Sequence, residues 1–340
     1  MAIRFGLYQN SIKKFINNQS IISKYRYKQF ILDLTENNDY ILPISLLTVI
    51  NGQQKKNNLK SVHGYEMATG IELLIIFLNI VETKKFNKIL NGNYSHATLT
   101  RDQTNLILKS NISNHICQEI TSMIYQTLNR NINDISTYYS SDAMIKIYLL
   151  ASEHLHAKID KINSTVSTME LPQDLEIQHK TFLENFHFVD SNNLNKLSCV
   201  KQLPKDFVLQ YISGTYGSIC KLALIFGWLI GGSVPDMIPN LEKIGYHFGI
   251  MIKLAYDFTN VERDVSVMNN GISFNYIINF GFQDAFELFD DCKRKFIEGV
   301  LTMNISTPTL KEFIDILERK VDCSLEQSSP DIKSSSSHPN

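Results

Sequence analysis

The sequence lacks the features that define several common protein classes. Its five cysteines are far apart and form no Cys-x-x-Cys pair, so they indicate neither a zinc knuckle nor a disulfide framework. We interpret them as free thiols in a reducing compartment. The net charge of −1 provides no basic surplus, so no nucleic acid partner is expected. The longest apolar run, residues 222–232, is well short of the roughly 20 residues of a membrane-spanning helix, so no transmembrane segment is predicted.

Acidic residues are also missing from residues 1–32, which carry basic residues only. These basic residues are Arg4, Lys13, Lys14, Lys24, Arg26 and Lys28. Such a charge pattern resembles an organelle transit peptide. The same stretch places apolar residues mostly at helical steps, and we interpret it as the first helices of the fold. The prediction is therefore a cytoplasmic protein, with a mitochondrial or other organellar location as the alternative.

What the sequence does contain is a set of strongly apolar helical segments. Hydrophobic residues make up 44% of the chain, enough to fill a large core. Residues 67–86 are apolar on nearly every face, and a helix of that kind belongs in the interior of an all-α protein. Residues 41–50 predict a second buried helix, with Pro43 in the first turn, where proline is tolerated.

The domain organisation follows from changes in composition along the chain. Residues 1–323 predict a single all-α domain. Within it, residues 163–206 are polar and broken by Pro172 and Pro204, and we interpret them as an insertion or a lid. Residues 324–340 are rich in serine and poor in large apolar groups, so they predict a disordered tail.

The segment MATGIELLIIFLNIVETKKF at residues 67–86 resembles a helix of the trans-isoprenyl diphosphate synthases, or polyprenyl synthetase family. That helix carries the family's first aspartate-rich motif, DDxxD, whose carboxylates hold Mg²⁺ ions that bridge the substrate diphosphate. In this chain the three aspartate positions fall on Glu82, Thr83 and Phe86. Glu82 is thus the only acid left and a candidate metal ligand. Lys84 and Lys85 follow, and we predict that they bind an anionic substrate group directly.

A second resemblance covers residues 234–264, where the family has glycines, a glutamine and a second DDxxD motif. Gly245 and Gly249 match the glycines, and Lys253 replaces the glutamine. The three aspartate positions fall on Tyr256, Asp257 and Asn260. One acid of three is therefore kept, and Lys253 becomes a third candidate substrate-binding residue.

The same turns allow another metal site. Asp257, Asn260 and Asp264 are spaced i, i+3 and i+7, which places them on one helix face. Terpene cyclases use a related motif at such spacings to hold one Mg²⁺. The candidate metal ligands are therefore Glu82, Asp257, Asn260 and Asp264. The alternative is a solvated helix end with no metal.

The remaining family motifs match in their glycines and not in their charged residues. Residues 215–232 resemble a helix that begins with Lys-Thr-Gly, but Thr215 stands at the lysine position. Residues 38–42, directly before Pro43, contain no basic residue, whereas the family's motif at this place holds a diphosphate with basic side chains. The resemblance implies an all-α fold, a large orthogonal helical bundle around a central cavity.

The function implied is less direct, because four phosphate- or metal-binding elements are changed. The main hypothesis is a catalytically degenerate homologue that acts as partner or regulatory subunit of an active prenyl diphosphate synthase, as a homodimer or heteromer. We expect the apolar faces near residues 222–232 and 106–124 to supply the partner surface. One alternative is an atypical Mg²⁺-dependent prenyltransferase or terpene synthase with a reduced metal site. Another is a binder of a prenyl diphosphate or apolar ligand. Mg²⁺ is the cofactor if the chain is active, and none is expected if it is a degenerate subunit.

Overall fold

The chain folds into long α-helices in the computed structural model, which describes residues 3–36, 38–53, 59–90, 99–173, 175, 177, 195–268 and 270–328. Within these ranges the only β pairing is an isolated bridge between Ile177 and Lys201. The all-α prediction is therefore confirmed. The helices are α1 (Ile3–Asn17), α2 (Ser20–Ser23), α3 (Lys28–Glu36), α4 (Ile41–Gly52), α6 (Tyr65–Ile89), α7 (Arg101–Leu108), α8 (Ser110–Ile135), α9 (Ser141–Thr168), α11 (Lys205–Gly214), α12 (Tyr216–Ile230), α13 (Ile238–Val267), α14 (Tyr276–Thr302) and α15 (Pro308–Ser328).

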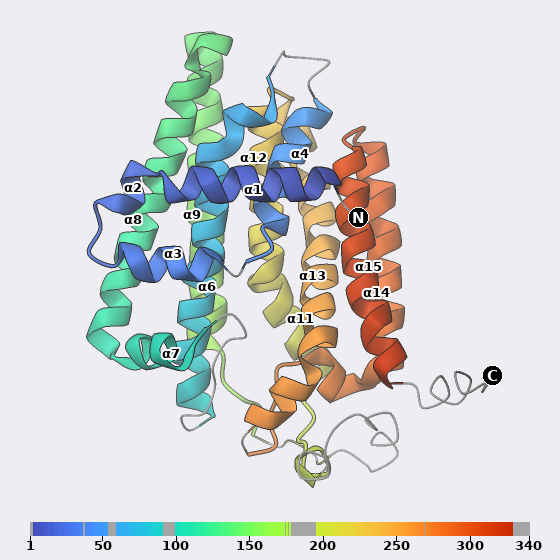
Figure 1. Cartoon of the computed structure of the whole chain (residues 1–340). Helices are drawn as coiled ribbons and strands as arrows, with labels where there is room; N and C mark the ends of the chain where they lie inside the picture. Colours follow the sequence, from blue (N-terminus) through green and yellow to red (C-terminus); the bar gives the residue numbers. More distant parts are fainter. Residues whose placement is uncertain are drawn as a thin grey trace, which may run out of the picture.

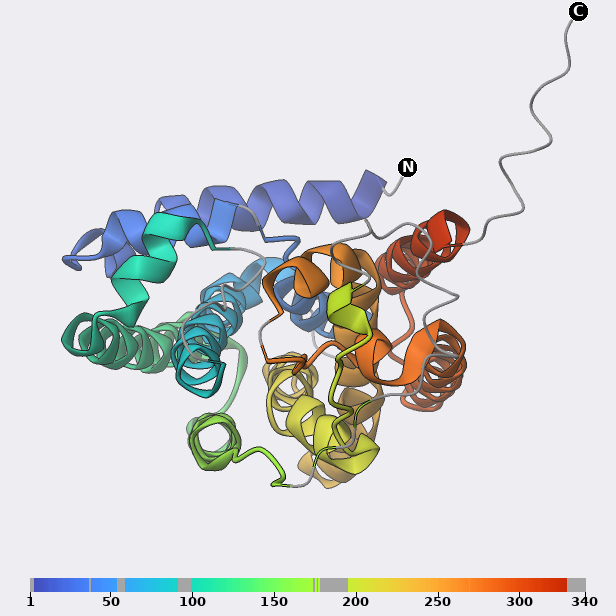
Figure 2. The same ribbon diagram turned by 90° about the horizontal axis from the view of Figure 1, so that it is seen from below.

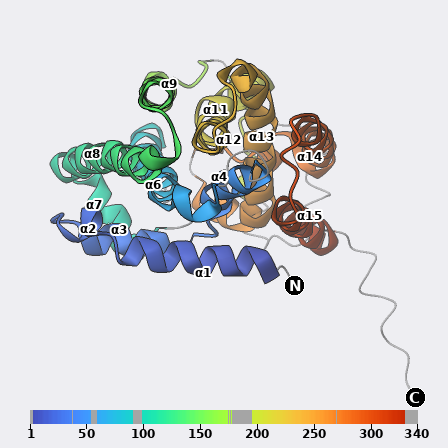
Figure 3. The same cartoon turned by 90° about the horizontal axis from the view of Figure 1, so that it is seen from above.

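The long helices run side by side, and α1 and α3 cross them on one face (Figure 1). Seen along the bundle, α6 lies between the α8–α9 pair on one side and α4, α12 and α13 on the other (Figure 3). Helices α14 and α15 cover the far side of α13 (Figure 3). Helix α6 corresponds to the predicted apolar helix at residues 67–86, and its central position explains why it is apolar on nearly every face.

Helix α12 forms the centre of the core. All of its residues except Lys221 are buried against other helices of the same chain. The expectation that residues 222–232 supply a surface for a partner is therefore wrong, because this apolar face is already covered. In residues 106–124, Ile107, Ile116 and Ile120 are buried in the core, whereas Leu108 is 39% exposed, so the expectation for this stretch stays a prediction.

Close helix contacts occur at glycines of the two segments that resemble the family, residues 215–232 and 234–264. A Cβ atom at Gly249 of α13 would lie 2.5 Å from the Cα atom of Gly217 in α12. A Cβ atom at Gly227 of α12 would lie 2.6 Å from the carbonyl oxygen of Leu46 in α4. These distances are too short for any side chain, so the glycines set the spacing of the central helices.

Two helical stretches are long and apolar enough to cross a membrane by composition alone, at Ser61–Ile89 and Lys205–Ile230. Their most apolar windows are 78% and 89% buried inside the bundle, respectively. Both stretches therefore pack as core helices against the rest of the chain.

The predicted tail begins later than expected. Helix α15 runs to Ser328, and Leu325 packs against the core, so residues 324–328 are helical. Residues 329–340 lie outside the described residues, as do 174, 176 and 178–194 of the predicted insertion or lid.

Replacing Gly249 with alanine should destabilise the fold, because the added methyl group meets the backbone of α12. Overpacking of this kind costs about 1–3 kcal/mol. Urea denaturation of G249A against the wild type measures the effect. Gly6→Ala in α1 is the matched control, since no atom lies within 4 Å of its Cβ position. An equal loss in both variants would contradict the close-packing explanation.

Candidate functional site

A cavity of about 260 Å³ lies between the C-terminal half of α6 and that of α13. Figure 2 views the bundle from this end. Helix α11, the segment at residues 272–275 and α15 contribute further side chains. The polar lining residues are Asn38, Asp39, Asn79, Glu82, Lys253, Asp257, Asn260, Arg263, Asp264, Ser273, Asn275 and Lys320. The apolar and aromatic lining residues are Tyr40, Ile75, Phe86, Leu90, Tyr211, Tyr216, Tyr256, Val267, Met268, Ile272 and Phe274.

The cavity brings together five of the seven residues predicted from sequence. Glu82, Lys253, Asp257, Asn260 and Asp264 all line it, from α6 and α13. Helix α6 and helix α13 are far apart in sequence, but their aspartate-motif turns face the same space, as the resemblance implies.

Lys84 and Lys85 point to the opposite side of α6. The Lys84 ammonium donates to the Asn114 side-chain oxygen at 2.6 Å, and the Lys85 ammonium donates to the Ser167 carbonyl at 2.6 Å. They line a separate cleft against α8 and α9. Their role in substrate binding remains a prediction, but the central cavity is not where they lie.

A buried ion pair occupies the middle of the cavity wall. The Lys253 ammonium donates to Asp257 Oδ1, and the two side chains are 11% and 3% exposed. The other Asp257 oxygen accepts the backbone N–H of Tyr276 at 2.9 Å. Asp257 is thus fully engaged and buried, so the alternative of a solvated helix end is wrong for this residue.

The charge of Lys253 also reaches two other carboxyl groups. Burial raises the pKa of Glu82 to about 7, and the nearby Lys253 charge and a hydrogen bond from the Tyr211 hydroxyl oppose that shift. Burial likewise raises the pKa of Asp264, and an amide hydrogen bond from Asn275 and the Lys253 charge oppose it. The charge of Lys253 therefore favours the ionised form of Asp257, Glu82 and Asp264, the three acids that the sequence analysis names as candidate metal ligands.

These acids do not fit the Mg²⁺ cluster that the resemblance implies. Asp257 is paired with Lys253, Glu82 accepts from Tyr211, and Asp264 accepts from Asn275 at 2.9 Å. In the part of the chain that the structure describes, no three His, Cys, Asp or Glu side chains are grouped so that they could hold a metal ion. At least one oxygen of each of these carboxyl groups accepts a hydrogen bond from a protein donor, and Lys253 supplies positive charge next to all three.

An aromatic stack replaces the third acid of the first motif. The rings of Phe86 and Phe274 are stacked with centroids 4.2 Å apart. Tyr211 packs against both, at 5.7 Å from Phe86 and 5.6 Å from Phe274. Phe86, which the resemblance aligns with a metal-binding carboxylate, is therefore part of an apolar wall.

Three further side chains, Asp39, Tyr256 and Lys320, meet at the side of the cavity that residues 38–40 line. The Tyr256 hydroxyl donates to Asp39 Oδ2 at 2.8 Å, and the Lys320 ammonium lies 3.1 Å from the same oxygen. Lys320 also lies 4.8 Å from the centre of the Tyr256 ring.

Sequence analysis missed Lys320 and Tyr211, because no local pattern links them to α13 or α6.

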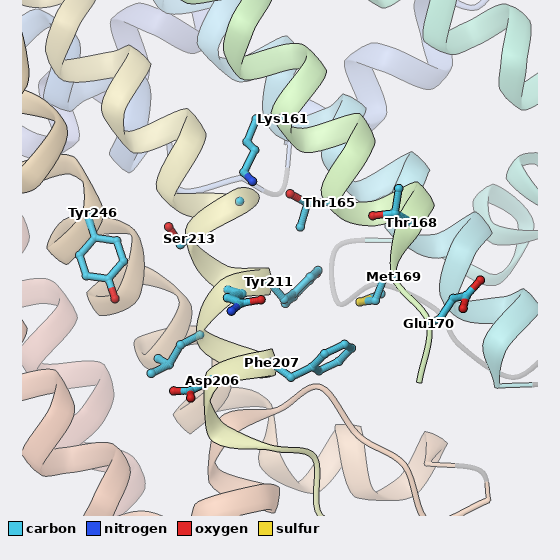
Figure 4. A pocket seen from close by; sticks show the side chains of 13 residues that line it. Lys161, Thr165, Thr168, Met169, Glu170, Asp206, Phe207, Tyr211, Ser213 and Tyr246 are labelled. Carbon is cyan, nitrogen blue, oxygen red and sulfur yellow. The ribbon is translucent and has the colours of Figure 1, made fainter. Parts of the chain in front are cut away.

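A second cavity of about 640 Å³ lies on the other side of Tyr211, between α9, α11 and α13. Figure 4 shows Lys161, Thr165 and Thr168 of α9 facing Tyr211 and Ser213 of α11. Tyr211 lines both cavities and is the wall between them.

Beside the central cavity, Glu72 is a buried carboxyl group in the middle of α6. Asn38 donates to Oε1, and Oε2 has no hydrogen-bond partner in the described part of the chain. Burial raises the pKa of Glu72 to about 8, so the group is largely protonated at neutral pH.

The comparisons with known structures match nearly the whole chain. A geranyltranstransferase from Thermotoga maritima has a TM-score of 0.54 and 12% identity, covering 94% of this chain and 96% of that one. A geranyltransferase from Legionella pneumophila has a TM-score of 0.57 and 9% identity, covering 95% and 96% respectively. A geranyltransferase from Helicobacter pylori, in complex with magnesium and isoprenyl diphosphate, has a TM-score of 0.52 and 12% identity, covering 94% and 96%.

No protein-family model matches the sequence, and no curated protein matches it. At identities of 9–13% the structural similarity establishes the architecture. It confirms the fold that the resemblance implied.

We expect the stability of the protein to fall as pH rises from about 5 to 8. A carboxyl group whose pKa is raised in the folded state binds its proton more tightly there than in the unfolded chain, so deprotonation favours unfolding. Glu72→Gln removes the largest such contribution, and the decline of the melting temperature with pH should become shallower. Glu170→Gln, at an exposed position, is the control. Parallel pH profiles for E72Q and wild type would contradict this assignment.

The similarity to these solved structures over nearly the whole chain shows that the chain has the isoprenoid synthase fold.

Proposed function

We propose that this protein is a divergent member of the polyprenyl synthetase family that lacks ordinary chain-elongation activity. In this proposal it acts as partner or regulatory subunit of an active prenyl diphosphate synthase. The observation that carries the proposal is the Lys253–Asp257 pair, which lies in the turns that resemble the family's second aspartate-rich motif. The proposal also draws on the similarity to a geranyltransferase that binds magnesium and isoprenyl diphosphate.

The physical argument concerns the leaving group. Metal ions in such enzymes stabilise the diphosphate as it departs and an allylic cation forms. In this chain the Lys253 charge is already compensated by Asp257 and shared with Glu82 and Asp264. Each missing contact to a charged group removes about 1.5–3 kcal/mol, and four such elements are changed. Transition-state stabilisation is therefore too weak for ordinary elongation.

A second candidate function is supported by the apolar half of the cavity. Ile75, Leu90, Val267, Met268 and Ile272 line it together with the Phe86–Phe274 stack. Such a wall suits an aliphatic ligand that is bound without being converted. Mass spectrometry of organic extracts from the purified protein distinguishes this function, because a binder retains such a ligand and an empty scaffold does not.

The functional test uses the full chain alone and in mixtures. With isopentenyl diphosphate, an allylic diphosphate and Mg²⁺, the chain alone should form no elongated product. Mixed with each prenyl diphosphate synthase of the same organism, it should form a complex with one of them and change that enzyme's rate or product length. Elongated product from the chain alone would overturn the proposal and favour the reduced-metal-site enzyme.

Replacing Lys253 with glutamine should expose the acids to metal. We expect the wild type to bind Mn²⁺, a paramagnetic substitute for Mg²⁺, only weakly, and K253Q to bind it at least tenfold more tightly. Electron paramagnetic resonance of free Mn²⁺ measures both affinities. Lys243→Gln is the matched control, because Lys243 is an exposed lysine of the same helix.

Breaking one half of a buried pair costs about 3–5 kcal/mol, so folding of K253Q must be checked by circular dichroism. The double variant K253Q/D257N removes both charges and should fold without gaining the metal affinity. Tight Mn²⁺ binding by the wild type would contradict the assignment of Lys253 as an internal cation.

A further inference from the structure

Helix α6 separates the central cavity from a cleft on its other side, and this cleft has no role in the function proposed above. Glu82 and Phe86 face the central cavity, whereas Val81, Lys84 and Lys88 line a cleft of about 730 Å³ on the opposite side. The other walls of this cleft come from α8 and α9, which lie beside α6 (Figure 3). Its polar rim and its apolar floor are built from different residues.

The rim of the cleft carries an excess of positive charge. Lys84, Lys85 and Lys88 all lie at its edge, and no Asp or Glu of the described chain lines it. The hydrogen-bond partners of Lys84 and Lys85 are neutral, the side chain of Asn114 and the carbonyl of Ser167. Lys84 and Lys88 are at positions i and i+4 of α6, where like charges repel one another. An anion bound between these ammonium groups would reduce that repulsion.

The floor of the cleft is apolar. Phe77, Ile80 and Val166 are almost completely buried beneath it. Val81 and Cys117 are half-buried and present apolar surface to the cleft. Burial raises the pKa of the Cys117 thiol to about 12, so it is a neutral, apolar group at physiological pH.

We infer that this cleft binds a phosphorylated aliphatic molecule, with its phosphate on Lys84, Lys85 and Lys88 and its chain over Val81 and Cys117. Ammonium groups bind phosphate as point charges, and three of them match a group that carries more than one negative charge. The apolar floor then adds affinity in proportion to the chain surface that it covers. The ligand is either free in solution or part of an anionic lipid surface, since both present the same chemistry.

Calorimetry with dodecyl phosphate below its critical micelle concentration tests the site on the full chain. We expect binding that strengthens from octyl to dodecyl phosphate, with at least tenfold weaker binding of dodecanol and of inorganic pyrophosphate. The double variant K84Q/K85Q should weaken dodecyl phosphate binding at least tenfold. The matched control is K13Q/K14Q, an adjacent lysine pair on α1 away from the cleft, which should leave binding unchanged.

Vesicle flotation separates the two sources of the ligand. Binding of free dodecyl phosphate without flotation on phosphatidic-acid vesicles assigns the site to a soluble ligand, and flotation that K84Q/K85Q abolishes assigns it to a lipid surface. The inference is overturned if neither probe binds, or if K84Q/K85Q and K13Q/K14Q behave alike.

The central cavity must be separated from the cleft in the same experiment. Phe274→Leu changes the central cavity only, so it should not affect dodecyl phosphate binding in the cleft. Binding that depends on Phe274 and not on Lys84 and Lys85 would place the ligand in the central cavity. That outcome overturns this inference and leaves the proposed function to be decided by the prenyl transfer assay.

Discussion

The buried contact between Lys253 and Asp257 determines the chemistry of the central cavity. A carboxylate removed from water requires a counter-charge and hydrogen bonds, and Asp257 receives both from Lys253 and the Tyr276 backbone. The same lysine offsets the burial of Glu82 and Asp264. Lys253 thus supplies positive charge next to all three acids, and Arg263 and Lys320 add two more cations to the cavity lining. Around it, the Tyr211 hydroxyl donates to Glu82 and the Asn275 amide donates to Asp264.

The scaffold and the site respond to different physical constraints. Helices α4, α12 and α13 approach closely only because glycines stand at their crossings, and α6 must be apolar on both sides because helices pack around it. These constraints persist whatever the cavity binds. The charged side chains that line the cavity do not set the spacing of the helices, so they can be substituted without loss of the fold. This difference explains how a chain at 9–13% identity keeps the architecture of geranyltransferases.

The fold was predictable from sequence for the same reason. The burial of α6 and the close contacts at Gly217, Gly227 and Gly249 follow from local patterns, and the structure bears them out. The convergence of Glu82 with Asp257 was also predictable, through the resemblance. The roles of Tyr211 and Lys320 were not, because each reaches the cavity from a helix more than a hundred residues away from its partner. The exposed partner surface was misjudged, because apolar composition does not tell whether a helix such as α12 is covered by its own chain.

The most direct test of this account is a crystal of the full chain grown with Mn²⁺ and a non-hydrolysable isoprenyl diphosphate analogue, examined by anomalous scattering. The account predicts the Lys253 ammonium on Asp257 and no manganese peak within about 2.1 Å of the Glu82, Asp257 or Asp264 oxygens. A manganese ion that bridges these carboxylates and the diphosphate, with Lys253 displaced, would contradict it.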